Sequence, residues 1–309
     1  VVVNRDLRIG EDGQGTVTLQ TDGLLDVRTY TSVGHVQDDG SGRLIMEGGV
    51  LETGYFTVAN DEVLQFRSDF KHGLIHVTGT PNGGQFNHQG GDFHIDGTLT
   101  GGVAEFEMSN DVLGVLGHDM VVGNGNEGGL TVRDEAHLTS DDTTIGWTDD
   151  ALGRVTVRDA ILIQTGDLVA GRMGQAQVTV ETGGIVSVDG DATLGRYAGS
   201  QGQITVTGFS TPDLTTRQST RFEITGEASG ADGNLIVGKM GDGLLNIHNG
   251  ATVDVVGDID LAIGEDTAGV INVSGTVEGL IQDLRSRLNV GGDLNLSQQF
   301  DDSSGLISL

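Results

Sequence analysis

The amino-acid sequence predicts an all-β fold, a single right-handed parallel β-helix with about 23–27 residues in each coil. Residues 171–208 contain one repeat unit twice in succession: a short apolar strand, a glycine turn and a longer alternating strand. An apolar residue followed by glycine marks this unit, and consecutive markers in the regular parts are 23–27 residues apart. A period of this length, made of strands alone, is typical of β-solenoids, and parallel strand connections are usually right-handed. The markers are Ile9-Gly10, Val33-Gly34, Val122-Gly123, Ile145-Gly146, Ala170-Gly171, Leu194-Gly195, Val237-Gly238 and Ile263-Gly264.

The composition agrees with many short strands joined by tight turns. The chain of 309 residues contains 52 glycines, two prolines and 4% aromatic residues, and glycine adopts positive φ without steric cost. It has no cysteine, so disulfides and thiolate metal sites are excluded. It also lacks a run of about 18 apolar residues, so the sequence predicts no membrane-spanning helix.

The charge of the chain is strongly acidic. Its 45 acidic and 16 basic residues give a net charge of −29, which argues against nucleic acid and against an anionic membrane as partners. Two interpretations stay open: a well-solvated surface, and weak Ca²⁺ binding by acidic turns. Because neither an EF-hand loop nor a calcium-binding nonapeptide occurs, we predict no cofactor and name no metal ligand. The acidic turns are Glu11-Asp12, Asp38-Asp39, Glu127, Asp149-Asp150 and Glu265-Asp266.

The alternating strand of each unit predicts which side chains face the core. Period-two alternation places these apolar pairs inside: Val17/Leu19, Leu130/Val132, Val155/Val157, Val178/Val180, Ile204/Val206, Leu245/Ile247 and Ile271/Val273. The residue between each pair faces outward, which predicts a column of Thr18, Thr131, Thr156, Thr179, Thr205, Asn246 and Asn272. We interpret this column as a ladder that packs neighbouring coils. Ice binding by a threonine face is a second interpretation, which the mixed flanking residues disfavour.

We expect one solenoid over residues 1–309 with variable regularity. A Ser/Thr-rich segment containing Pro212 follows one alternating strand and predicts a loop extruded from a coil. Leu280, Leu284 and Leu288 are four residues apart, which predicts a short helix over residues 279–288, while residues 288–290 and 294–296 read as strands. The predicted organisation is regular coils over 1–53, irregular coils over 54–120, regular coils over 121–275 with a loop insertion near 209–221, and C-terminal coils or a cap over 276–309.

Two stretches carry a family resemblance: residues 235–275, LIVGKMGDGLLNIHNGATVDVVGDIDLAIGEDTAGVINVSG, and residues 83–99, GGQFNHQGGDFHIDGTL. Their order of Ile-Gly, glycine loop, Gly-x-Leu/Val-x-Val and Gly-Asp resembles the passenger domains of bacterial autotransporters and related extracellular β-helix repeat proteins. The resemblance covers most of the chain. It implies a right-handed β-helix at the cell surface or outside the cell, with surface glycans or host and cell-surface proteins as partners.

Candidate chemistry is sparse. His88, Asp92, His94 and Asp96 form the densest set of potential ligands, and His94 and Asp96 share one face of a strand, which can begin a metal site. An outward histidine on a strand is nevertheless ordinary. Acidic pairs such as Asp149-Asp150 and Asp189/Asp191 carry little information among 45 acidic residues. GxSxG and GxxxxGK[ST] are absent. We therefore name no catalytic, cofactor-binding or metal-binding residue.

These observations predict a non-enzymatic, extracellular structural or adhesive protein. The first and last coils of a solenoid expose unpaired strand edges, and the apolar stretches 1–3 and 306–309 favour end-to-end self-association into filaments. The alternative is a polysaccharide lyase, a glycoside hydrolase or a glycan-binding β-helix whose groove lies beside residues 209–221.

Overall fold

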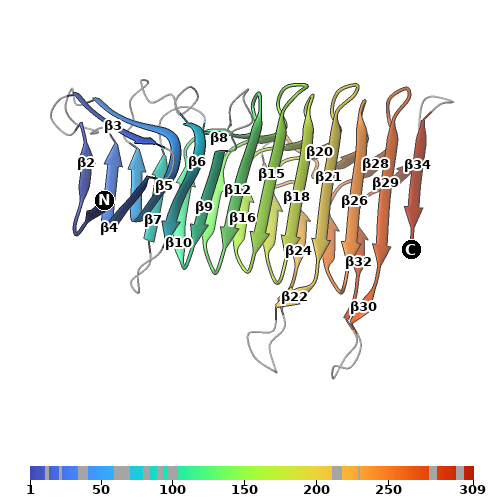
Figure 1. The fold of residues 1–309 in the computed structure, drawn as a ribbon. Coiled ribbons are helices and arrows are strands. Elements are labelled where there is room, and N and C mark those ends of the chain that lie inside the picture. Colours follow the sequence, from blue (N-terminus) through green and yellow to red (C-terminus); the bar gives the residue numbers. More distant parts are fainter. Residues whose placement is uncertain are drawn as a thin grey trace.

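The computed structural model of the chain is an elongated stack of short β-strands, with the two termini at opposite ends (Figure 1). The prediction of an all-β fold is confirmed, and parallel pairing makes the stack solenoid-like. None of the described residues forms a helix long and apolar enough to cross a membrane. The structure describes residues 1–10, 14–20, 23–33, 41–58, 70–78, 84–88, 93–95, 104–210, 218–228, 230–277, 284–296 and 303–309.

Three faces surround the core, and within each face every strand pairs in parallel with its counterpart on the next coil. The long face contains β1 (Val2–Val3), β4 (Leu24–Val33), β5 (Ser41–Val58), β6 (Phe70–Thr78), β9 (Ala104–Ser109), β12 (Glu127–Arg133), β15 (Leu152–Arg158), β18 (Gln175–Glu181), β21 (Gln201–Thr207), β26 (Asp242–His248), β29 (Ala268–Ser274) and β34 (Ser304–Ser308). The later parts of β4 and β5 continue onto the second face, and residues 41–47 of β5 pair with β3 (Gln14–Gln20) outside the long face.

The second face, here called the medial face, contains β2 (Leu7–Ile9), β7 (Gly84–His88), β10 (Val112–Leu116), β13 (His137–Ser140), β16 (Ile161–Gln164), β19 (Ile185–Val188), β24 (Arg221–Ile224), β27 (Thr252–Val255) and β32 (Arg287–Val290). The short face contains β8 (Phe93–Ile95), β11 (Met120–Val122), β14 (Thr143–Ile145), β17 (Leu168–Ala170), β20 (Ala192–Leu194), β25 (Leu235–Val237), β28 (Ile259–Leu261) and β33 (Leu294–Leu296).

Two small antiparallel pairs leave the stack on the same side (Figure 1). β22 (Phe209–Ser210) with β23 (Gln218–Ser219) follows β21, at the place of the predicted loop. β30 (Thr276–Val277) with β31 (Leu284–Arg285) follows β29. Of the predicted helix over 279–288, residues 279–283 lie outside the described residues, and the prediction is wrong for the rest, which contributes β31 and the start of β32. Leucines four residues apart also fit strands when a turn separates them.

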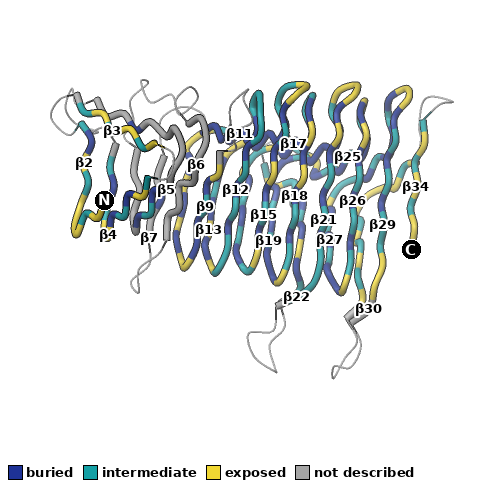
Figure 2. The backbone as a smooth tube through the Cα atoms, in the orientation of Figure 1, coloured by how far each residue is buried: buried dark blue, intermediate teal, exposed yellow. Residues whose placement is uncertain are grey.

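The core follows the predicted alternation. The inward pairs of β12, β15, β18, β21 and β26, together with Ile271, are buried, whereas Val17, Leu19 and Val273 are partly buried (Figure 2). Nearer the N-terminus, three phenylalanines fill the core: the rings of Phe86, Phe93 and Phe106 have centroids 4.7–5.4 Å apart. Each coil therefore covers the apolar residues of its neighbour, which is the main stabilising interaction of repeat folds.

Five of the marker glycines turn the chain from the short face to the long face. Gly123, Gly146, Gly171, Gly195 and Gly238 all have positive φ, between 66° and 80°, where a Cβ atom is strained. Three predicted markers do not lie at this turn. Ile9 and Val33 end strand segments of the medial face, so Ile9-Gly10 and Val33-Gly34 follow a different face. In the coil after Gly238, Ala262 takes this position with φ 51°, and its N–H donates to the Val237 carbonyl. Ile263-Gly264 therefore lies beyond the equivalent turn.

The predicted register also needs one correction at the N-terminus. β3 (Gln14–Gln20) pairs with residues 41–47 of β5, so Thr18 lies opposite Ile45. The column that contains Thr131 instead passes through Glu107, in the preceding strand of the long face. The same sequence pattern lies on a different face here because the coils before β9 divide their residues differently among the three faces.

Candidate functional site

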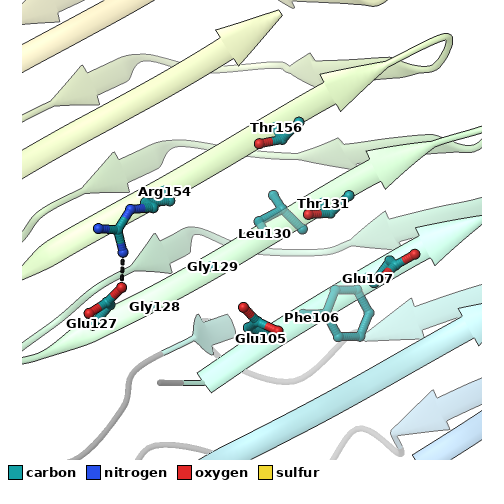
Figure 3. Close-up of a pocket in the computed structure, with 10 residues that line it drawn as sticks. All are labelled: Glu105, Phe106, Glu107, Glu127, Gly128, Gly129, Leu130, Thr131, Arg154 and Thr156. Carbon is teal, nitrogen blue, oxygen red and sulfur yellow. Dashed lines mark ion pairs between the residues drawn. The ribbon is translucent and has the colours of Figure 1, made fainter. Parts of the chain in front are cut away.

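A shallow hollow of about 200 Å³ lies on the outer surface of β9, β12 and β15 (Figure 3). It exists because Gly129 occupies an outward position between Glu105 and Arg154 and has no side chain to fill it. Gly129 forms the floor of the hollow, and carboxylates, hydroxyls and one guanidinium surround it. The lining residues are Glu105, Phe106, Glu107, Glu127, Gly128, Gly129, Leu130, Thr131, Arg154 and Thr156.

Ion pairs engage two of the three carboxylates of the hollow. Arg154 pairs with Glu127, and Arg133 Nε lies 2.5 Å from Glu107 Oε1. Burial alone lowers the pKa of Arg133, but the hydrogen bonds and charges of Glu107 and Asp134 outweigh it and raise that pKa above its ordinary value. The hollow is thus a polar, largely charge-balanced surface. Two strands, β18 and β21, separate it from the β22–β23 pair, so it is not a groove beside residues 209–221.

The predicted threonine column is present on the long face from β12 onward. Thr131, Thr156, Thr179 and Thr205 are direct neighbours, followed by Asn246 and Asn272. Asn272 Nδ2 donates to Asn246 Oδ1 at 2.9 Å. The column ends at Glu107 on one side, and Arg154, Gln177 and Gln203 flank it. Such a mixed surface supports the interpretation of a ladder between coils.

The histidine and aspartate set is only partly described. His94 lies at the centre of β8 beside Val121 and is 9% exposed, so it lines no open surface. Asp92, Asp96 and the side chain of His88 lie outside the described residues. Among the described residues, no group of three or more His, Asp or Glu side chains could hold a metal ion.

A carboxylate ladder gives many turn acids a structural role that sequence reasoning missed. Each ladder residue directly precedes a short-face strand, and the Oδ1 of each one before Asp293 accepts the backbone N–H of the equivalent residue on the next coil, at 2.7–3.3 Å. Asp191 belongs to this ladder, while Asp189 accepts from Thr225 Oγ1 at 3.1 Å. The recurring Asp or Asn before each apolar triplet is the signal that could have revealed it. The ladder comprises Asp119, Asp142, Asp167, Asp191, Asn234, Asp258 and Asp293.

Serines at the bases of the two antiparallel pairs bind the same turn. Ser219 Oγ donates to the Gly250 carbonyl at 2.8 Å, and the Gly250 N–H donates to Ser286 Oγ at 3.1 Å. Both pairs therefore emerge at fixed positions on either side of the coil that contains β26. Ser286 Oγ also donates to the Ser274 carbonyl at 2.7 Å, so the end of β29 is hydrogen-bonded to the same serine.

The ends of the stack expose apolar residues that belong to core columns. Leu294 and Leu296 pair with Ile259 and Leu261, which are fully buried, yet they are 46% and 50% exposed. Ile307 pairs with buried Ile271 and is only partly buried. At the other end Val3, Leu7, Val17 and Leu19 are also partly buried. Among the described residues, both ends thus present an incompletely covered core.

Comparisons of the chain with protein-family models, with curated proteins and with solved structures find no match.

Proposed function

We propose that this chain is a non-enzymatic, extracellular structural or adhesive protein, one continuous right-handed parallel β-helix that self-assembles end to end into filaments. The observation that carries the proposal is the pair of open core ends. Leu294 and Leu296 stand in columns whose preceding members are fully buried, so a further coil placed over them would extend the core without a change of register.

The direction of the strands supports a head-to-tail interface. All strands of the three faces pair in parallel, so the free edges at the two ends are complementary, whereas two identical ends would meet antiparallel. A head-to-tail contact that does not close into a ring generates an open filament. Burial of exposed leucines contributes roughly 25 cal/mol per Å² of apolar surface.

The test blocks each end separately. Leu294→Glu with Leu296→Glu blocks the C-terminal end, Val17→Glu blocks the N-terminal end, and Leu113→Glu is the control, because Leu113 is 54% exposed on β10 in the middle of the stack. Light scattering and negative-stain microscopy should show filaments for the original chain and the control, and monomers for either blocked variant. Circular dichroism checks that each variant is folded.

Mixing the two blocked variants sharpens the test, since each keeps one intact end. An equimolar mixture should form dimers and nothing longer. A chain that remains monomeric at high concentration, or an end-blocked variant that still forms filaments, refutes end-to-end assembly.

A second candidate is a polysaccharide-acting protein, which the three carboxylates around the hollow favour. Incubation with acidic and neutral polysaccharides should then yield new reducing ends or unsaturated products, and Glu105→Gln should lower the yield. No product from any polysaccharide excludes this candidate and leaves the filament proposal intact.

A further inference from the structure

Three successive turns between the short and long faces carry a basic residue directly after the marker glycine. These residues are Arg172, Arg196 and Lys239, and their turns lie along the upper edge of the stack in Figure 2. The Arg196 N–H donates to the Gly171 carbonyl at 2.9 Å, and the Lys239 N–H donates to the Gly195 carbonyl at 3.0 Å. The three residues therefore occupy equivalent positions, with adjacent coils about 4.8 Å apart. Together with Trp147 and Tyr197 they form what we call the basic ridge.

Aromatic rings hold the arginines of the basic ridge. Arg172 Cζ lies 4.0 Å from the ring centroid of Trp147 and 5.6 Å from that of Tyr197, and Arg196 Cζ lies 5.7 Å from the same tyrosine. Ser200 Oγ donates to the Tyr197 carbonyl at 2.6 Å, which braces that turn. A guanidinium stacked on a ring keeps its in-plane N–H groups available, and these match a carboxylate bidentately.

The cations of the basic ridge differ from other arginines of the chain. Arg133, Arg154 and Arg221 each have a carboxylate within 4 Å. Within the part of the chain that the structure describes, no ion pair involves Arg172, Arg196 or Lys239. Like charges in adjacent turns repel one another, and an anion that lies over them reduces this repulsion. In a chain with 16 basic residues and a net charge of −29, three such neighbours are a concentrated exception.

We propose that the basic ridge binds an acidic polysaccharide, a uronate-containing chain lying along the axis of the stack. A linear polymer with regularly spaced carboxylates matches cations that recur once per coil. The aromatic rings add apolar surface for sugar rings, as in other sites where Trp and Tyr combine an apolar body with a polar tip. Duplex nucleic acid is disfavoured because the rest of the acidic surface repels it. The proposal uses the side of the stack, so it is independent of assembly at the ends.

Trp147, the single tryptophan, provides a built-in reporter because Arg172 stacks on it. The probe is polygalacturonate, and the matched control ligand is the same polymer with its carboxylates methyl-esterified. We expect polygalacturonate to change the Trp147 emission at low salt with an affinity that falls as salt rises, and the esterified polymer to have no effect. The combined substitutions Arg172→Gln, Arg196→Gln and Lys239→Gln should weaken binding at least tenfold, measured by calorimetry.

A second triple variant removes the same number of charges at positions outside both the basic ridge and the hollow: Arg158→Gln, Arg221→Gln and Arg287→Gln. It should change affinity less than threefold, which separates the basic ridge from net charge. Circular dichroism establishes that both variants are folded. The proposal is overturned if polygalacturonate does not bind, if the ridge variant binds like the original chain, or if the esterified polymer binds equally well. Equal binding of duplex DNA or of vesicles containing anionic lipid also overturns it.

Discussion

Gln164 is a polar residue in a core column, so its replacement tests whether an apolar side chain packs better there. It ends β16 on the medial face and is fully buried, and among the described residues neither its amide nitrogen nor its amide oxygen has a hydrogen-bond partner. Its neighbours on the adjacent coils are Ser140 and Val188. The core column continues through Ile224 and Val255, so an apolar residue fits this position.

We predict that Gln164→Leu raises the free energy of unfolding by about 2 kcal/mol or more. A buried polar group without a partner costs about 1 to 3 kcal/mol, and the amide contributes two such groups. Leucine has a similar volume, so the substitution should neither open a cavity nor overpack the core. Gln164→Ala, in contrast, should gain less because it leaves an unfilled space.

Equilibrium unfolding in urea measures this effect, followed by circular dichroism and by the emission of Trp147. The matched control is Gln201→Leu, because Gln201 is exposed on β21 and its replacement should change stability by less than about 0.5 kcal/mol. The midpoint should rise for Gln164→Leu with an unchanged slope. A lower or unchanged midpoint would show that the buried Gln164 amide is not destabilising, which would refute this prediction.

Three further predictions follow from other parts of the stack and use the same urea midpoint. Asp167→Ala removes the acceptor of the Asp191 N–H, 2.9 Å away, and should lower the free energy of unfolding by about 1 kcal/mol, as loss of a helix cap does. Asp167→Asn should have little effect, since Asn234 plays this role naturally. Equal losses of stability for both variants would contradict the ladder. Gly202→Val should lower the free energy of unfolding by about 3 kcal/mol or more, because a Cβ there lies 2.1 Å from the Ala170 carbonyl oxygen. In Gly199→Ala the new Cβ meets none of the described atoms within 4 Å, so only the positive φ is destabilising. Similar losses of stability for both variants would contradict steric exclusion at Gly202. Phe106→Ala should cost about 3 to 5 kcal/mol because its ring packs against two other phenylalanines, and a loss below 1 kcal/mol would show that this core is loosely packed.

The regular half of the fold could be predicted because its pattern is local. In β12, β15, β18 and β21 each inward residue alternates with an outward one, and the glycine markers supply the positive φ that the turn needs. The N-terminal coils repeat the same pattern on a different face. Their register depends on which strand lies opposite, and this choice is made by packing between coils rather than by the strand itself. For that reason the position of Thr18 could not be predicted.

In the candidate sites, too, the residue types could be predicted from the sequence, but the contacts between coils could not. The many acidic residues were visible as composition, but none of the acidic turns named from the sequence belongs to the ladder. Recognising the ladder required knowing that Asp142, Asp167 and Asp191 lie on neighbouring coils. The basic ridge was missed because Arg196 and Lys239 are 43 residues apart in the sequence, across the β22–β23 pair, yet their turns are adjacent. A binding surface of a solenoid is made of residues from successive coils, which are far apart in the sequence.

By itself the sequence determined that this chain is all-β, rich in turns and repetitive, because strand alternation and glycine turns act over a few residues. Only the tertiary structure decided which columns of side chains meet. Stacking brings residues from successive coils to about 4.8 Å from one another, whatever their separation in the chain. It is this stacking that leaves Leu294 and Leu296 uncovered at one end and aligns Arg172, Arg196 and Lys239 along one edge.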